Sequence, residues 1–305
     1  MPQYIVKRLL YTVLTIVLVS TITFFLMQLI PGGPFLAEKA PTPAVLEKMN
    51  EKYGLDQPVI VQYKNFMVKL AQGDLGVSIK KKGRDVTDII AEKFPISARL
   101  GLTAIIIAIS IGIPMGATAA LKRGKKIDNL LMFIATLGTS VPGFVVATTL
   151  MILFGVKFKI FPTYGLTTPL HYVLPAFTLS FYPMAYIARL TRSTMLEVLN
   201  QDYIRTARAK GVSQFSVLFK HALRNAILPV ITYLGPLLAY ILTGSFVVEK
   251  IFTIPGLGGE FISSIGHRDY PLIMGTTIFL ATLLVCMNVV VDILYKVIDP
   301  RIKLK

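Results

Sequence analysis

Six long apolar stretches without Asp, Glu, Lys or Arg recur along the chain. They cover residues 9–30, 100–121, 130–156, 170–188, 225–248 and 271–291. An α-helix rises 1.5 Å per residue, so about 20 residues cross the hydrocarbon core of a bilayer, and each stretch has roughly that length. Membrane barrel strands are about 9–11 residues long and alternate in polarity, which does not fit. The pattern predicts an all-α integral membrane protein with six transmembrane helices.

The composition supports this prediction and excludes other classes. The 305 residues are 54% hydrophobic and 16% charged, and the mean hydropathy is +0.65. A soluble domain carries about 25% charged residues, and a chain this apolar does not stay disordered in water. One cysteine, Cys286, excludes an intrachain disulfide scaffold. A cleaved signal peptide is disfavoured because 9–30 exceeds the usual apolar region of about 7–15 residues and no small-x-small site follows it.

The positive charges alternate between loops. Residues 1–8, 122–129, 189–224 and 292–305 hold seventeen Lys and Arg, whereas the two short loops 157–169 and 249–270 hold four. Loops rich in Lys and Arg stay on the cytoplasmic side, and segments beyond about 60 residues, such as 31–99, cross regardless of charge. Both termini are therefore predicted inside. The net charge of +16 then reflects topology, which disfavours nucleic-acid binding.

The long segment 31–99 is predicted to form a small helical cap outside the membrane. Thr42-Pro43 is typical of a helix start, and Gly54 of its end. Apolar residues at helical spacing predict a second helix between Val59 and Gly73, and a third apolar pattern ends at Pro95. Packing alone and a docking or gating surface both remain open as its role.

The inner loop 189–224 is far longer than a turn. Tyr203, Ile204 and Ala207 share one face of a short predicted helix, and Gly211 suits a left-handed helix end. A second helix is predicted from Phe215 to Arg224. An amphipathic helix resting on anionic lipid and a protein-docking element are both open interpretations.

The sequence contains no motif typical of a catalytic, cofactor or metal site. The sequence lacks phosphate-binding glycine motifs, metal-ligand spacing and a nucleophile triad, so no catalytic, cofactor or metal site is predicted. The stretches also lack the carboxylates that ion-coupled carriers place within the bilayer. Prolines and glycines inside them, such as Pro142-Gly143, suit either structural kinks or broken helices along a polar path. A path without its own energy source points to a partner that supplies one.

Arg205-Thr206-Ala207-x-x-x-Gly211 resembles the E-A-A-x-x-x-G loop of ABC-importer permeases. Further stretches narrow the resemblance to the oligopeptide/dipeptide/nickel branch, nearest to its B-type oligopeptide subunit. They are Pro31-Gly32-Gly33-Pro34-Phe35, Gly73-Asp74-Leu75-Gly76, His221-Ala222-Leu223-Arg224-Asn225-Ala226, Thr243-Gly244-Ser245, Pro255-Gly256-Leu257-Gly258, Arg268-Asp269-Tyr270 and the 291–300 segment. Arg205 stands where the wider family often has Glu, so an ion pair made by that Glu cannot be carried over.

The resemblance implies a type I ABC importer permease fold in a bacterial or archaeal cytoplasmic membrane. The predicted parts are helix 1–30, cap 31–99, a five-helix core 100–291 with coupling loop 189–224, and tail 292–305. Implied partners are a second, non-identical permease, two ATPases that carry ATP and Mg²⁺, an extracytoplasmic binding protein and a peptide. The implied ATPase-coupling helix comprises Tyr203, Ile204, Arg205, Thr206, Ala207, Arg208, Ala209, Lys210, Gly211 and Val212.

The resemblance leaves the substrate open. Oligopeptides are expected, and dipeptides, glutathione or nickel are the alternatives within the branch. A secondary carrier is disfavoured by the carboxylate-free stretches, and a membrane enzyme by the missing catalytic cluster. The residues that line the substrate path are not predicted.

Overall fold

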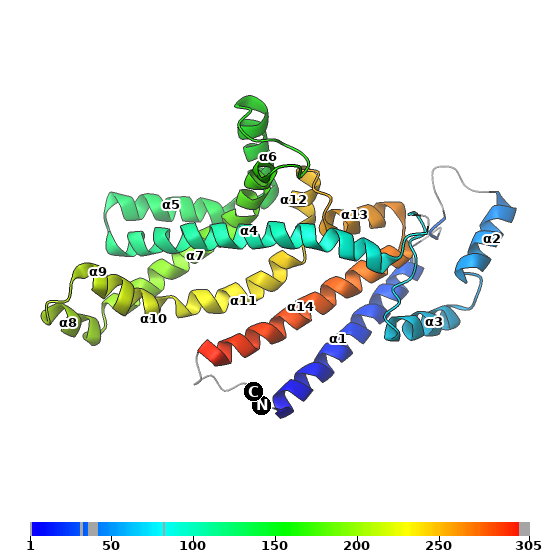
Figure 1. Ribbon diagram of the computed structural model, residues 1–305, viewed down its shortest axis with the longest axis horizontal. Helices are drawn as coiled ribbons and strands as arrows, with labels where there is room; N and C mark the ends of the chain where they lie inside the picture. The colour runs from blue at the N-terminus through cyan, green and yellow to red at the C-terminus, as the bar shows by residue number, and fades with distance from the viewer. Residues whose placement is uncertain (1, 31–32, 36–41, 82, 299–305) are drawn as a thin grey trace. The chain divides into compact units, whose positions relative to one another are not determined.

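The computed structural model describes residues 2–30, 33–35, 42–81 and 83–298, and its regular elements are helices (Figure 1). Within these ranges, β-structure is limited to one isolated antiparallel bridge between Val77 and Asp85. The sequence interpretation also used Pro31, Gly32 and the tail residues from Asp299 onward. These residues lie outside the described ranges. The chain divides into an N/C unit, Met1–Ile96 with Pro255–Lys305, and a central unit, Ser97–Ile254.

The N/C unit is built on two long helices that lie side by side, α1 in blue and α14 in red (Figure 1). Its core gathers Val86, Ile89, Ile90, Leu257 and Leu272, all at most 4% exposed. Phe24 of α1 stacks on Phe66 of α3 with 5.6 Å between ring centroids. Its helices are α1 (Pro2–Gln28), α2 (Pro43–Tyr53), α3 (Val59–Ala71), α13 (Leu257–His267), α14 (Tyr270–Ile298) and the first turns of α4 (Val86–Leu121).

Local sequence signals set the ends of α2. Pro43 occupies the first turn after the N-cap Thr42, where its missing N–H costs nothing, and Gly54 ends the helix with φ +65°. The predicted helices at α2 and α3 are thereby confirmed. The apolar pattern that ends at Pro95 and the stretch 100–121 belong to one helix, because α4 continues through Pro95 and Pro114 to Leu121. Burial of Ile89 and Ile90 on the preceding turns offsets the hydrogen bond that Pro95 removes.

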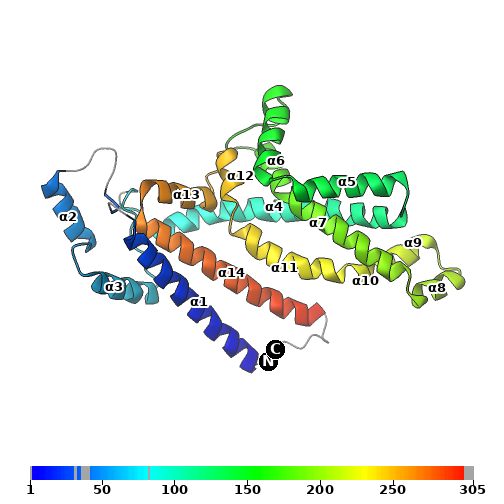
Figure 2. The same ribbon diagram turned by 180° about the vertical axis from the view of Figure 1, so that it is seen from behind.

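The central unit is a helical bundle around α7. α5 and α6 both pack on α7, as do α11 and α12 (Figure 2). Its elements are the rest of α4, α5 (Lys126–Ser140), α6 (Gly143–Leu150), the π-helix η1 (Met151–Lys157), the 3₁₀-helix η2 (Pro169–Tyr172), α7 (Val173–Leu199), α8 (Asp202–Ala209), α9 (Gln214–Ser216), the π-helix η3 (Val217–Leu223), α10 (Arg224–Ala226), α11 (Leu228–Leu242) and α12 (Phe246–Ile251).

Glycines allow α4 and α5 to approach α7 closely. A Cβ at Gly116 would lie 2.3 Å from the Ala188 carbonyl oxygen, and one at Gly138 would lie 2.5 Å from the Ala185 Cβ. Gly112 and Gly116 are four residues apart, the small-residue spacing that brings membrane helices into contact. The bundle is therefore held by backbone-to-backbone packing as well as by side chains.

By length and composition, the described residues contain three helices able to cross a membrane, or up to five if each of two bent helix pairs is one span. The predicted stretch 130–156 is not one straight helix: α5 and α6–η1 meet at 107°. Pro142 pushes Val141 into extended backbone, which ends α5. The stretch 225–248 is also interrupted, because α11 ends at Leu242 before Gly244, whose φ is +89°. Six spans, their orientation and the domain boundary at residue 99 stay predictions, although α4 runs across that boundary.

Candidate functional site

The predicted coupling segment forms the short helix α8 at one end of the central unit. Asp202 opens the helix, where a negative charge suits the exposed N–H groups, and its carbonyl accepts a 3.0 Å hydrogen bond from Thr206 Oγ1. The Arg205 guanidinium lies 3.5 Å from the Asp202 carboxylate, and both side chains are largely exposed. This exposed pair adds little stability, so α8 depends on its packing for a fixed position.

Gly211 ends the helix as predicted, with φ +74°. The Gly211 N–H donates to the Arg208 carbonyl at 3.0 Å, and the Val212 N–H donates to the Ala207 carbonyl at 3.2 Å. A Cβ at Gly211 would meet nothing within 4 Å. The requirement for glycine here is therefore one of backbone conformation alone.

One face of α8 is anchored in a compact cluster. Ile204 is fully buried and Ala207 is 9% exposed, and they pack with Met195 of α7 and with Val217 and Ala222 of η3. Tyr203, which was expected on the same face, is 43% exposed and lies at its edge, where its hydroxyl accepts a 2.8 Å hydrogen bond from Asn225. The helix thus has an anchored apolar face and an opposite exposed surface.

The exposed surface of α8 is basic. Arg205, Arg208 and Lys210 are exposed, and Gly211 follows them at the turn. The next segment is helical, as predicted, but η3 is a π-helix. Phe215 and Phe219 project from α9 and η3, with their rings 4.4 Å apart and 72% and 49% exposed. The exposed side of α8 and the segment after it therefore carry both cationic and aromatic side chains.

The sequence did not predict a salt bridge between α5 and α7. Asp128 of α5 is 2% exposed and accepts two hydrogen bonds from Arg192 of α7, at 2.7 and 2.8 Å, and one from the Gly124 N–H at 2.9 Å. The hydrogen bonds to Asp128 raise the pKa of the Arg192 guanidinium above its usual value. The pair ties the start of α5 to the part of α7 that leads into α8.

In the N/C unit, the Arg268-Asp269-Tyr270 stretch contacts the segment 77–81, which directly follows the Gly73–Gly76 stretch. Asp269, 1% exposed, accepts hydrogen bonds from the Ser78 hydroxyl and from the backbone N–H groups of Ile79 (3.1 Å) and Lys80 (3.2 Å). Lys81 forms a 2.7 Å salt bridge with Glu260 of α13. A buried carboxylate with several donors fixes a loop strongly. Asp269 therefore positions the 77–81 segment at the start of α14.

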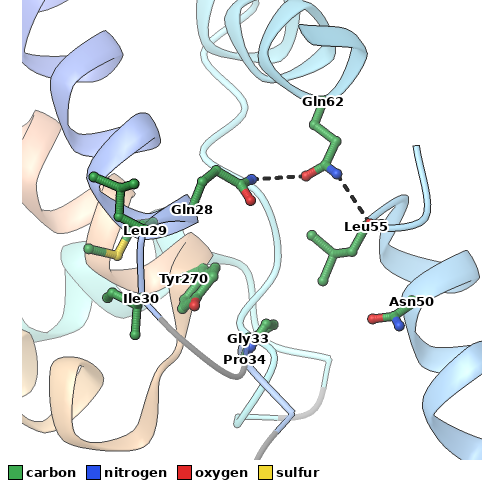
Figure 3. Close-up of a pocket in the computed structure, with 10 residues that line it drawn as sticks. Gln28, Leu29, Ile30, Gly33, Pro34, Asn50, Leu55, Gln62 and Tyr270 are labelled. Carbon is green, nitrogen blue, oxygen red and sulfur yellow. Dashed lines mark hydrogen bonds between the residues drawn. The ribbon is translucent and has the colours of Figure 1, made fainter. Parts of the chain in front are cut away.

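A pocket of about 360 Å³ lies at the end of α1 (Figure 3). Gln28 donates to Gln62 at 3.1 Å, and Gln62 donates in turn to the Leu55 carbonyl at 3.2 Å. Tyr270 also lines the pocket, and its buried hydroxyl has no hydrogen-bond partner among the described residues. Within the same residues, no cluster of three His, Cys, Asp or Glu could hold a metal ion.

Two family models match the chain. The model described as "binding-protein-dependent transport system inner membrane component" matches residues 112–304, and the model of the N-terminal part of such a membrane component matches residues 1–101. The chain belongs to this family. Family membership confirms the predicted inner-membrane transport component, and the family is a membrane component without catalysis of its own.

Curated relatives match over the whole length. The chain is 50% identical to a Bacillus subtilis "dipeptide transport system permease protein DppB", covering 100% of this chain and 99% of the relative. It is 42% identical to a Haemophilus influenzae "oligopeptide transport system permease protein OppB", covering 99% and 100%. The predicted resemblance to the oligopeptide/dipeptide branch is confirmed.

Solved structures of ABC transporters share the fold. An inward-facing MetNI methionine transporter matches with TM-score 0.58 and 17% identity, over 70% of this chain and 97% of the other. An amino acid ABC transporter matches with TM-score 0.50 and 18% identity, over 71% and 95%. At this identity the likeness concerns the fold, and it confirms the predicted all-α ABC permease fold.

Proposed function

We propose that this chain is one of two non-identical permease subunits of an ATP-driven importer for oligopeptides. The names and full-length similarity of the OppB and DppB relatives support the peptide substrate. Dipeptides are the second candidate, because the relative at 50% identity carries that name. In this proposal the chain forms half of the path, and an extracytoplasmic binding protein delivers the peptide.

The observation that carries the mechanism is the division of α8 into two faces. Ile204 and Ala207 hold one face against α7 and η3, while Arg205 and Arg208 leave the other face free to contact a partner. A helix that transmits force must not slide on its own subunit. Burial of Ile204, with no exposed surface, provides that attachment.

The partner proposed for α8 is an ATPase subunit on the cytoplasmic side. Two such subunits bind ATP and Mg²⁺, and their closure pushes α8. Because α8 packs on α7 and η3, the displacement reaches the membrane helices directly. The helices then alternate between inward-open and outward-open states, a rigid-body switch driven by differential binding of ATP to the two states. ATP hydrolysis belongs to the partners in this scheme.

An affinity purification tests this proposal. The tagged chain is expressed with its native neighbours, extracted in mild detergent and analysed by mass spectrometry. We expect a second permease and two ATPases in comparable amounts, and ATP-dependent peptide uptake after reconstitution. Recovery of the chain alone, with uptake that needs no ATP, would overturn the proposal.

A further inference from the structure

The exposed faces of α7 and α11 carry unusual side chains for helices within predicted membrane stretches. On α7 the exposed or half-buried stripe is Tyr182 and Tyr186, followed just beyond the predicted stretch by Arg189, at spacings of four and three. On α11 the corresponding stripe contains Tyr233 and Tyr240, seven residues apart. Both spacings place the residues on one side of a helix. Tyr182 is 53% and Tyr240 is 72% exposed.

The two stripes are joined. α7 packs against α11, and the rings of Tyr186 and Tyr233 lie 4.3 Å apart with an interplanar angle of 32°. The hydroxyls of the four tyrosines make no hydrogen bond with another residue in the described part of the chain. Tyr182, Tyr186, Tyr233 and Tyr240 are here named the tyrosine track, whose α7 and α11 parts meet at Tyr186 and Tyr233.

Other exposed surfaces of the central unit differ from the track. On α5 the large exposed side chains are Ile127, Leu130, Phe133, Ile134 and Leu137, and Ile106 of α4 is 65% exposed. Such side chains suit acyl chains, whereas a tyrosine hydroxyl without a partner is costly in hydrocarbon. The track therefore suits a polar surrounding better than acyl chains.

Two observations favour a polar ligand over a second protein subunit. Close membrane-helix contacts in this chain use small residues, as at Gly112 and Gly116, whereas the track projects bulky rings. Its hydroxyls are free to donate and accept, which matches the N–H and C=O groups of a peptide backbone. The track also continues to Arg189, whose charge matches a terminal carboxylate.

We propose that the tyrosine track of α7 and α11 binds the transported peptide in its passage through the permease. This inference rests on the proposed function and names the residues that line the path. Tyr233 and Tyr240 are separated by about 10 Å along the helix axis, the length of roughly three extended peptide residues. Rings and hydroxyls contact backbone and side chains without reading a sequence, so the track predicts broad peptide acceptance.

Thiol accessibility in the assembled, membrane-embedded complex tests the track. Cys286 is first replaced by Ala, and Tyr240→Cys is compared with the matched control Ile106→Cys, also an exposed position in a predicted membrane stretch. A negatively charged, membrane-impermeant methanethiosulfonate is the probe. We expect it to modify Tyr240→Cys about tenfold faster than Ile106→Cys, because charged reagents are excluded from acyl chains. Trialanine, supplied with the binding protein, should slow the modification several-fold.

The outcomes separate the track from the proposed function. Equal, slow modification at both positions would overturn the track, and so would modification of Tyr240→Cys that trialanine does not slow. Either result leaves the proposed function standing if the Cys286→Ala complex imports trialanine with ATP. If that complex does not import peptide at all, the proposed function fails and the track fails with it.

A second measurement separates binding from structure. Tyr182→Phe and Tyr240→Phe keep the rings and remove the hydroxyls, so the complex should still assemble. We expect the KM for trialanine uptake to rise several-fold. Unchanged uptake kinetics in both variants, or loss of the second permease from the complex, would contradict peptide binding by these hydroxyls.

Discussion

The Asp128 carboxylate and the Arg192 guanidinium form a two-pronged salt bridge, with Nε–Oδ1 and Nη2–Oδ2 distances of 2.7 and 2.8 Å. Arg192 lies in the part of α7 that leads into α8, and Asp128 lies in the first turn of α5. The bridge therefore fixes two helices next to the proposed coupling helix. This geometry is specific to arginine, because the planar guanidinium donates two parallel hydrogen bonds, whereas the lysine ammonium group acts as a point charge.

Removal of this bridge should destabilise the protein. Asp128→Ala leaves the guanidinium without its partner, and because Arg192 remains 29% exposed, water compensates in part. We expect a loss of about 2 kcal/mol in unfolding free energy, below the range for a fully buried pair. Thermal unfolding in detergent measures it. Arg205→Gln, which breaks the exposed pair with Asp202, is the control and should cost less than about 0.5 kcal/mol. Equal losses in the two variants would contradict the account.

Gly211→Val should uncouple ATP hydrolysis from peptide uptake without preventing membrane insertion. A β-branched residue at φ +74° costs roughly 1–2 kcal/mol and displaces the end of α8. Gly73→Val is the matched control, because Gly73 has φ +80°, no neighbour within 4 Å and a place far along the chain from α8. The ratio of ATP hydrolysed to trialanine imported is the readout. A normal ratio for Gly211→Val would contradict the role of α8 in coupling.

Asp269→Asn should loosen the 77–81 segment. An amide oxygen accepts hydrogen bonds less strongly than the buried carboxylate. The amide NH₂ group that replaces the second oxygen is a donor, and it would face the donating N–H groups of Ile79 or Lys80. We expect a loss of about 2 kcal/mol and faster hydrogen exchange at Ile79 and Lys80. Asp74→Asn serves as the comparison, since exposed Asp74 accepts a bond from the Gly76 N–H. Unchanged exchange in Asp269→Asn would show that the carboxylate does not hold this segment.

Gly→Ala substitutions at two helical positions should change the stability of the protein in opposite directions. At Gly116 the new methyl group meets the Ala188 carbonyl oxygen and Thr191, so the helices must separate, at a cost of about 1–3 kcal/mol. At Gly266 of α13 nothing lies within 4 Å, so alanine should stabilise by up to about 1 kcal/mol. Melting temperatures of the two variants in the same detergent decide this. Stabilisation by Gly116→Ala would contradict the close contact of α4 with α7.

Local rules predicted the elements whose ends depend on neighbouring residues. Thr42-Pro43 and Gly54 delimit α2, and Gly211 ends α8, because cap conformation is a property of a few consecutive residues. The 107° bend at Pro142 was foreseen only as a possible kink, since a proline inside an apolar stretch is compatible with a continuous helix, as Pro114 in α4 demonstrates. Sequence alone does not decide between these two outcomes.

Contacts between residues that are far apart in the chain could not be predicted from the sequence. Ser78 and Asp269 are 191 positions apart, and Asp128 and Arg192 are 64 apart. Asp269 had been interpreted through its local motif and Arg192 through its charge, and nothing in the sequence singled out Ser78 or Asp128. The tyrosine track was missed for the same reason: Tyr186 and Tyr233 belong to different helices, and only packing of α7 on α11 brings their rings together.

The most direct test of the central claim is peptide uptake by proteoliposomes under two kinds of energy depletion. The complex is reconstituted with its binding protein, and trialanine import is followed with ATP present, with ATP removed, and with ATP present plus a protonophore. The account predicts import that requires ATP and the binding protein and that the protonophore leaves unchanged. Import by this chain alone without ATP, abolished by the protonophore, would contradict it and favour a secondary carrier.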